Sequence, residues 1–205
     1  MIAIIDYKAG NLTSVQLAFA YLGVKAEITD QPEKILAAGR VVFPGVGSAG
    51  AARRSIMALR LENVLKEIAA RGTPFLGICL GTQIIFDSSE EDGGTEGLAL
   101  LSGKVRRFMP ADRADKVPQI GWNSVTIIKK HPVLEGIEDQ SEFYFVHSYY
   151  PEPRNKAEII GATDYAGITF ASIVGRNNLV ATQFHPEKSG RIGLKLLENF
   201  SRWSP

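Results

Sequence analysis

The chain has 205 residues, of which 45% are hydrophobic and 22% are charged, and its formal net charge at pH 7 is +1. This composition excludes a disordered or fibrous protein and leaves room for one well-packed globular domain. Because the charges nearly balance, we do not expect the chain to bind nucleic acid.

Cysteine usage and the N-terminus predict a cellular compartment. Cys79 is the only cysteine, so an internal disulfide is excluded, which is typical of a reducing compartment. The first residues, MIAIIDYKAG, lack the basic segment and long apolar stretch of a signal peptide. No uncharged apolar run approaches the roughly 20 residues that a membrane-spanning helix needs. We therefore expect a cytoplasmic protein without a membrane partner.

The first half of the chain alternates strand-like and helix-like segments. Short apolar runs predict strands, and apolar residues at helical spacing predict the helices between them. The expected strands are residues 2–5, 24–28, 41–43 and 75–78, and the expected helices are 12–22, 32–38, 51–70 and 80–86. This alternation favours a parallel sheet that is covered by helices on both faces.

The second half is richer in strands. The expected strands are residues 125–128, 143–150, 157–162, 168–174 and 179–184, with a hairpin turn at Asn177-Asn178 and a closing helix over 192–203. The sequence contains no internal repeat, low-complexity tract or obvious linker. We therefore expect one domain over residues 1–205, an α/β three-layer sandwich with a mixed, mostly parallel sheet.

The lone cysteine lies in an unusual setting. Cys79 stands between Gly77 and Gly81, after a predicted buried strand and before a predicted helix. This Gly-x-Cys-x-Gly pattern resembles a nucleophile elbow, in which a sharp turn projects the nucleophile above the sheet. The backbone N–H of Leu80 would then point toward a developing oxyanion. The alternative is a buried structural cysteine, and the local pattern alone leaves both interpretations open.

A thiolate nucleophile needs a base, and the base needs an orienting group. Of the three histidines, His185 is the best candidate, because Glu187 follows it two residues later and Pro186 stiffens the link. His131 precedes a proline in a polar loop and is interpreted as a surface residue. His147 falls within a predicted strand, where a packed or hydrogen-bonded histidine is more common than a base.

Taken together, these motifs resemble the class I, or triad, glutamine amidotransferases, and among them the glutaminase subunits of imidazole glycerol phosphate synthase. The elbow Gly-Ile-Cys-Leu-Gly-Thr-Gln and the later His-Pro-Glu are the strongest matches. The resemblance covers residues 6–7, 9–12, 43–47, 77–83, 88–91, 117–118, 121–123, 144–149 and 183–190. It therefore runs nearly from end to end.

The resemblance implies roles for the matched positions. The implied triad is Cys79, His185 and Glu187, with oxyanion N–H groups from Val46 and Leu80. The residues implied to hold L-glutamine are Gly45, Gly47, Gln83, Ser148 and Tyr149. The family also implies a (βα)₈-barrel cyclase partner that receives the released ammonia and forms a heterodimer with this chain. The positions implied near that partner are Asn11, Trp122, Tyr144 and Lys188.

The sequence departs from the family pattern at a few positions. Ser48-Ala49-Gly50 stands where an aromatic residue usually follows the Pro-Gly-Val-Gly motif, Thr82 replaces Met or Leu, and Lys8 replaces a small residue. Scattered histidines and one cysteine lack ligand spacing, so no metal and no other cofactor is expected.

Three rival interpretations come from other classes. A glutaminase serving pyridoxal phosphate or anthranilate synthesis would typically show two adjacent glycines where Gly45-Val46-Gly47 stands. In an α/β-hydrolase the acid normally precedes the histidine, whereas Glu187 follows His185. A homologue that only binds a partner is disfavoured by the intact triad, and a glutaminase assay distinguishes it.

Overall fold

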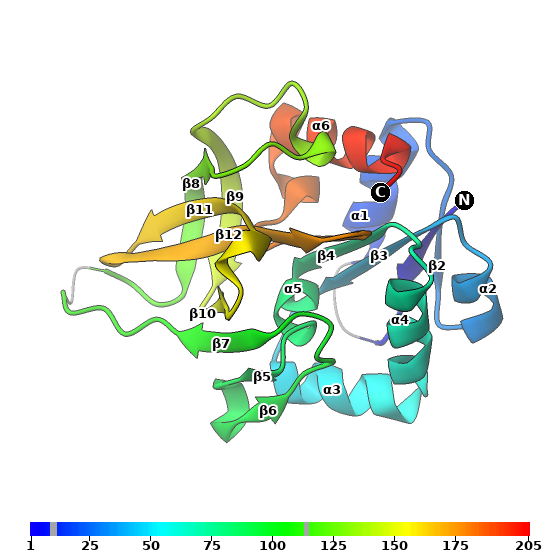
Figure 1. Ribbon diagram of the computed structural model, residues 1–205, viewed down its shortest axis with the longest axis horizontal. Coiled ribbons are helices and arrows are strands. Elements are labelled where there is room, and N and C mark those ends of the chain that lie inside the picture. The colour runs from blue at the N-terminus through cyan, green and yellow to red at the C-terminus, as the bar shows by residue number, and fades with distance from the viewer. Residues whose placement is uncertain (9–11, 113–114) are drawn as a thin grey trace.

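The computed structural model describes residues 1–8, 12–112 and 115–205 (Figure 1). A nine-stranded sheet runs through its centre, in the order β2-β1-β3-β4-β13-β12-β11-β8-β9. The strands in that order are β2 (Ala26–Thr29), β1 (Ile2–Ile5), β3 (Arg40–Gly45), β4 (Phe75–Cys79), β13 (Leu179–Thr182), β12 (Ile168–Arg176), β11 (Ile159–Tyr165), β8 (Gln119–Ile127) and β9 (Ser141–His147). The sheet is mixed, as expected: β2, β1, β3, β4 and β13 pair in parallel, and the remaining pairs are antiparallel.

Helices cover both faces of the sheet, which confirms the three-layer prediction. They are α1 (Leu12–Tyr21), α2 (Pro32–Leu36), α3 (Ala49–Ala58), α4 (Leu61–Ala70), α5 (Leu80–Ile84) and α6 (Gly190–Arg202). In β1, Ile2 and Ile4 pack on the face covered by α1 and α6, and Ala3 and Ile5 pack on the opposite face with α3 and α4. Successive side chains of the strand therefore point to opposite faces of the sheet and pack in two separate apolar cores.

A second, smaller sheet was not predicted. It has the order β10-β7-β5-β6, with β10 (Tyr149–Pro153), β7 (Gly103–Arg107), β5 (Ser88–Ser89) and β6 (Thr95–Glu96). The expected strand over 143–150 is divided at Ser148 between β9 of the large sheet and β10 of the small one. Short 3₁₀-helices complete the elements: η1 (Glu91–Gly93), η2 (Pro132–Leu134), η3 (Lys156–Glu158) and η4 (Pro186–Lys188).

The prediction of one helix over 51–70 was wrong. The chain forms α3 and α4, which are separated at Arg60, a residue in the left-handed region at φ 56° and ψ 30°. The break lets Leu61 and Leu65 pack in the same core as Ile56. The hairpin prediction is confirmed, because Arg176 pairs with Leu179 across a two-residue turn in which Asn177 has a positive φ of 53°.

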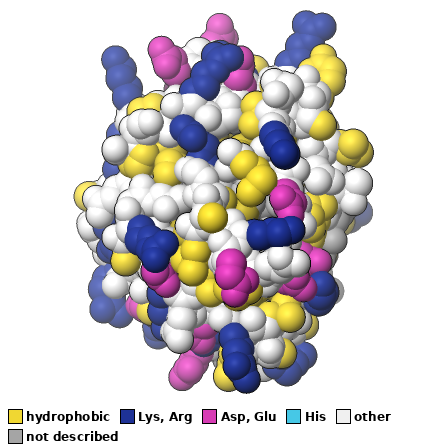
Figure 2. Space-filling model, turned by 90° about the vertical axis from the view of Figure 1, so that its right-hand side faces the viewer, with side chains coloured by type: hydrophobic (Ala, Val, Ile, Leu, Met, Phe, Trp, Pro, Cys, Tyr) yellow, Lys and Arg dark blue, Asp and Glu magenta, His cyan; other side chains and the backbone are white. Residues whose placement is uncertain are grey.

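The surface beside α2 and α4 carries cations and anions side by side. Figure 2 shows Lys and Arg interspersed with Asp and Glu on this face. Pairs such as Lys34–Glu27 and Lys66–Glu62, each with 2.7 Å between nitrogen and oxygen, account for part of this pattern. Within the described part of the chain, none of the helices has the length and apolar character needed to cross a membrane.

Candidate active site

Cys79 forms a sharp turn between a strand and a helix. It ends β4 and leads directly into α5, with φ 54° and ψ −109°. Residues with side chains rarely adopt this conformation, and such strain persists only where the surrounding structure enforces it. The turn places the thiol at the carboxyl end of a central parallel strand, where open α/β sheets place their sites.

Close packing at Gly81 explains the glycine after the turn. A Cβ at this position would lie 1.7 Å from the carbonyl oxygen of Phe43 in the neighbouring strand β3. Thr82, one of the departures from the family pattern, donates a 2.6 Å hydrogen bond from its hydroxyl to the carbonyl of Thr182. The turn at Cys79 is therefore held against β3 on one side and β13 on the other.

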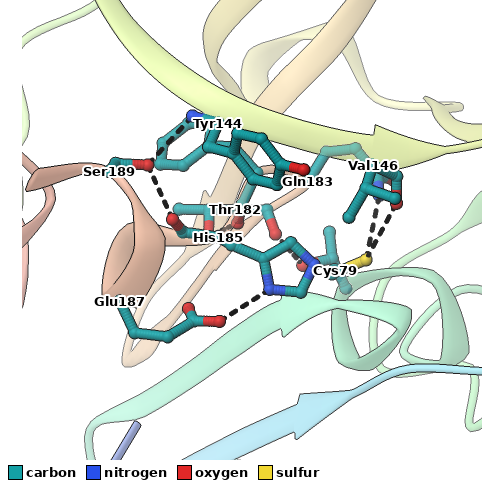
Figure 3. Close-up of polar contacts among 10 residues, drawn as sticks. Cys79, Tyr144, Val146, Thr182, Gln183, His185, Glu187 and Ser189 are labelled. Atoms are coloured by element: carbon teal, nitrogen blue, oxygen red, sulfur yellow. Dashed lines mark hydrogen bonds and ion pairs between the residues drawn. The ribbon is translucent and has the colours of Figure 1, made fainter. Parts of the chain in front are cut away.

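His185 and Glu187 form a buried pair beside the thiol. His185 Nδ1 lies 2.8 Å from Glu187 Oε1, and both side chains are only 3% exposed. The backbone N–H of His185 donates to the carbonyl of Tyr144 (2.9 Å), and the Ser189 hydroxyl donates to the carbonyl of His185 (2.6 Å). The imidazole lies between Glu187 and Cys79 (Figure 3), and its buried Nε2 has no hydrogen-bond partner among the described residues.

The environment of His185 favours its charged form. Burial lowers the pKa of His185, but the opposite charge of Cys79 and the hydrogen bonds and charge of Glu187 outweigh burial and raise the pKa to about 10. An imidazolium is a proton donor, and an adjacent thiolate is a nucleophile. The arrangement can therefore perform acyl transfer.

His147 lies in the same region but is held differently. Its Nδ1 is 2.8 Å from the carbonyl oxygen of Tyr149, so Nδ1 carries the proton. Its ring packs against Phe108, Phe145 and Phe170. Burial is the main cause that lowers the pKa of His147 to about 4. The hydrogen bond to the Tyr149 carbonyl raises this pKa, and the charge of His185 lowers it further. His147 is thus a packed, neutral histidine, as its strand position predicted.

His131 lies elsewhere and makes no contact with this site. Its Nδ1 accepts a hydrogen bond from Val133 N–H (3.3 Å), and its ring packs against Trp203 with 4.9 Å between centroids. Burial, with a smaller contribution from Lys129, lowers the pKa of His131 to about 4.

A cavity of about 380 Å³ opens above the thiol. Most residues singled out from the sequence line it: Val46, Gly47, Cys79, Leu80, Gln83, Ser148, Tyr149 and His185. Glu187 lies behind His185 and does not line the cavity, and Gly45 pairs with Cys79 across β3 and β4. The structure therefore brings together residues that are more than 100 positions apart.

Glu91 was not assigned a role from the sequence, although its segment belongs to the matched motifs. It lines the cavity and is the only carboxylate that does so among the described residues. Its Oε2 accepts a 2.7 Å hydrogen bond from the N–H of Ala49, so the side chain braces the start of α3. Burial raises the pKa of Glu91, the Ala49 N–H opposes this, and the neighbouring Asp92 adds to it.

Gln183 is a second residue that the sequence analysis left without a role. It is fully buried, and its Nε2 lies 3.8 Å from Cys79 Sγ. Its Oε1 accepts a 3.1 Å hydrogen bond from Gln83 Nε2, which also donates to the carbonyl of Tyr149 (2.9 Å). The two glutamine side chains therefore connect the cavity wall to the thiol.

Two of the candidate partner residues, Trp122 and Tyr144, lie on the outer strands, and Lys188 of η4 lies near Tyr144. Trp122 of β8 pairs with Tyr144 of β9, with their ring centroids 6.1 Å apart. Lys188 Nζ lies 6.0 Å from the centre of the Tyr144 ring, and Lys188 also lines the cavity. Trp122 is 55% exposed and Ile120 is 64% exposed. Asn11, the fourth candidate, lies outside the described residues.

The donor groups of a metal site do not come together in residues 1–8, 12–112 or 115–205, where no cluster of three or more His, Cys, Asp or Glu is suited to hold an ion. The expectation that the chain needs no metal stays a prediction.

The whole chain is similar to proteins of known type. A profile described as glutamine amidotransferase class-I matches residues 3–202. The protein named imidazole glycerol phosphate synthase subunit HisH of Dehalococcoides mccartyi is 47% identical over 200 residues, covering 98% of this chain and 96% of its own. The protein of the same name in Methanocaldococcus jannaschii is 48% identical over 200 residues, covering 98% of each chain.

Solved structures show the same fold. The structure of PurLQS from Thermotoga maritima has a TM-score of 0.76 at 15% identity and covers 98% of this chain and 97% of that chain. Such low identity shows the fold alone, whereas the profile and the HisH relatives also show the family. The chain belongs to the class I glutamine amidotransferases.

Proposed function

We propose that this chain is the glutaminase subunit of an imidazole glycerol phosphate synthase, a cytoplasmic enzyme of histidine biosynthesis. In this proposal residues 1–205 form one glutamine amidotransferase domain that hydrolyses L-glutamine to glutamate and ammonia without a cofactor. The observation that carries the proposal is the buried His185–Glu187 pair facing Cys79 at the base of the cavity. The HisH relatives, which match nearly the full length, support the choice of this synthase.

The proposed chemistry starts from a Cys79 thiolate beside a protonated His185, the pair that the raised pKa of His185 favours. The thiolate attacks the carboxamide carbon of glutamine, and N–H groups of Val46 and Leu80 stabilise the oxyanion that forms. The C–N bond then breaks, and His185 gives its proton to the leaving nitrogen, so ammonia departs and a glutamyl thioester remains. His185 next accepts a proton from water, which attacks the thioester and releases glutamate. Glu187 orients the imidazole throughout.

The cavity offers suitable groups for the rest of the substrate. In this proposal Gln83, Ser148, Tyr149 and the backbone of Gly45 and Gly47 hold glutamine. The carboxylate of Glu91 supplies the negative charge that a substrate ammonium group requires. Both N–H groups of Gln83 are used within the chain, so we expect this side chain to meet the substrate through its oxygen.

The proposed partner is a (βα)₈-barrel cyclase subunit. Ammonia from Cys79 would react there with a phosphorylated ribulosyl intermediate to give imidazole glycerol phosphate and an aminoimidazole carboxamide ribotide. The outer-strand surface formed by Trp122, Tyr144 and Lys188 is the proposed contact, because it combines exposed aromatic area with a cation beside the cavity.

We expect the isolated chain to be a poor glutaminase that its partner activates. Val46 is β-branched and stands between Gly45 and Gly47, of which Gly47 has a positive φ of 97°. Because the φ and ψ angles of this β-branched residue are restricted, we expect a resting loop in which the N–H of Val46 does not face the oxyanion. A missing oxyanion donor costs about 10²–10³ in kcat. A partner can restore it only through differential affinity for the two loop conformations.

The test compares steady-state glutamine hydrolysis by the chain alone, with the cyclase, and with the cyclase plus an analogue of its acceptor. We expect the rate to increase at each step and Cys79→Ala to be inactive in all three conditions. Equal rates in the three conditions would contradict activation by the partner but not the glutaminase function. Absence of hydrolysis in every condition would contradict the function itself.

A further inference from the structure

The sulfur of Cys79 has neighbours of opposite polarity on two sides. The carbonyl oxygen of Val146 lies 3.8 Å from Sγ and can only accept a hydrogen bond, so it suits the neutral thiol. The side-chain Nε2 of Gln183, also 3.8 Å from Sγ, can only donate, so it suits the thiolate. Figure 3 shows Val146, Gln183 and His185 around the sulfur.

The orientation of the Gln183 amide follows from its neighbours. The backbone carbonyl of Tyr149 must accept, so the side-chain atom of Gln83 that lies 2.9 Å from it is Nε2. The second hydrogen of that nitrogen points to Gln183 Oε1 at 3.1 Å, which turns Gln183 Nε2 toward the sulfur. The backbone carbonyl of Tyr149, which can only accept, therefore fixes the donor and acceptor roles in the hydrogen bonds from Gln83 through Gln183 to Cys79.

Burial makes this contact difficult to replace. Gln183 is 0% exposed and Gln83 is 5% exposed, so neither side chain is freely hydrated. The main-chain N–H of Gln183 donates to the carbonyl of Ser172 at 2.9 Å, which fixes the residue just beyond β13. A buried amide without hydrogen bonds is costly, and a low-dielectric setting strengthens those that it makes to a charge.

We propose that Gln183 is a catalytic residue whose side-chain N–H stabilises the Cys79 thiolate, and that Gln83 is the positioning residue that orients it. When Cys79 ionises beside the protonated His185, its S–H bond breaks, the proton leaves to solvent, and the Gln183 amide donates to the resulting thiolate. The Val146 carbonyl has the opposite effect, because it stabilises the neutral thiol. This inference rests on the proposed function, since it assigns the thiolate as the reacting form.

The test uses the fact that Cys79 is the only cysteine in the chain. The rate of iodoacetamide alkylation, followed by intact mass against pH, reports this thiolate alone and needs no glutamine. Gln183→Met removes the donor while keeping the length of the side chain. We expect the midpoint of the alkylation profile to rise by roughly one pH unit. Because the remaining thiolate is then more nucleophilic, the rate below the midpoint should fall only about threefold.

Two further variants isolate the cause. Gln183→Glu keeps the shape but places a carboxylate beside the sulfur, so its midpoint should rise further than that of Gln183→Met. Gln119→Met is the matched control, because Gln119 is also buried, at 3% exposure, but neither lines the cavity nor makes a hydrogen bond to the sulfur. Its profile should coincide with that of the unaltered chain.

Steady-state kinetics provide an independent readout in the complex with the cyclase. Gln183 does not line the cavity, so Gln183→Met should lower kcat and leave KM unchanged, whereas Gln83→Met should change both. A midpoint unchanged in folded Gln183→Met would overturn the inference without affecting the glutaminase proposal. If the unaltered complex failed to hydrolyse glutamine while the alkylation midpoint of Gln183→Met was still shifted, the glutaminase proposal would be overturned and the role of Gln183 toward the thiolate would stand.

If Gln183→Met does not fold, the unaltered chain still provides the test. The ¹⁵N and ¹H resonances of the Gln183 side-chain amide should move as Cys79 ionises, with the same midpoint as alkylation. The movement should disappear in Cys79→Ala. Resonances that stay constant through the alkylation midpoint would overturn the inference.

Discussion

The parallel half of the large sheet (β2, β1, β3, β4 and β13) and its antiparallel half (β12, β11, β8 and β9) differ in how their residues are packed. In the parallel half, β3, β4 and α5 pack so closely around Cys79 that the carbonyl of Phe43 occupies the place of a side chain at Gly81. In the antiparallel half, β8 exposes Ile120 and Trp122 to solvent. Closely packed backbone therefore surrounds the thiol, whereas the outer strands leave apolar side chains exposed to solvent.

The strand β13 joins these halves and explains how the site is assembled. It pairs in parallel with β4 and antiparallel with β12, and His185 comes three residues after its last residue, Thr182. Thr182 lies opposite Ile78 in the register, so the chain leaves β13 beside the turn at Cys79. One strand pairing thus places the candidate base beside the candidate nucleophile.

The largest expected effect comes from the histidine at this junction. His185→Ala should lower kcat for glutamine hydrolysis in the complex by several orders of magnitude, because nucleophile and base act as a unit. Glu187→Gln should cost less, since Glu187 orients the ring and does not transfer the proton. Steady-state assays of both variants check this order. An inactive His147→Ala combined with an active His185→Ala would mean that the base has been assigned wrongly.

The rigidity of the parallel half is tested by its closest backbone contact. Gly81→Ala should lower the free energy of unfolding by about 3 kcal/mol, because its methyl group would overlap the Phe43 carbonyl. Gly39→Ala is the matched control: its Cβ would meet nothing closer than the carbonyl of Met1 at 3.8 Å. Urea unfolding of both variants measures the difference. Equal stabilities would show that the backbone around Cys79 yields easily.

Acid should destabilise the chain through its neutral histidines. The pKa of His147 is about 4 in the folded state and near 6.5 when unfolded, so the unfolded chain binds more protons between these values. The free energy of unfolding should therefore decrease as pH falls from 6.5 to 4, by about 3 kcal/mol from His147. His131 acts in the same direction, whereas the raised pKa of His185 keeps its proton bound in the folded chain throughout this range.

Urea unfolding at several pH values measures this slope. His147→Phe should reduce it, because phenylalanine suits the aromatic surroundings and does not titrate. His131→Ala should remove only the contribution of His131 to this pH dependence and leave the contribution of His147. A slope unaffected by His147→Phe would show that folding does not lower the pKa of His147.

The smallest expected effect concerns the exposed strands. Trp122→Ala should weaken binding to the cyclase by about 2 kcal/mol, roughly 30-fold in Kd, as for a central aromatic residue of an interface. Its thermal unfolding midpoint should hardly change, since the side chain is 55% exposed. Met57→Ala removes a similarly exposed side chain, at 61%, from α3 and should leave binding unaltered. Equal Kd values for the two variants would place the interface elsewhere.

Local patterns in the sequence predicted the fold, the turn at Cys79 and the pairing of His185 with Glu187, because the residues concerned are close in sequence, whereas the family resemblance supplied the remaining cavity residues. The glycines around Cys79 and the Glu187 after His185 are such cases. Gln183 escaped assignment because its contact with Cys79 joins residues 104 positions apart. The small sheet was missed because β5 and β6 have only two residues each. The helix break at Arg60 lacks a glycine or proline signal, so only tertiary packing defines it.

The central claim is that Cys79 forms a covalent intermediate with glutamine, and one measurement tests it directly. The chain, activated by the cyclase, is mixed with glutamine, quenched in acid within the first turnover and examined by intact-mass and peptide mass spectrometry. The account predicts a glutamyl adduct on the peptide that contains Cys79, and neither adduct nor hydrolysis in Cys79→Ala. Hydrolysis that persists in Cys79→Ala would contradict it.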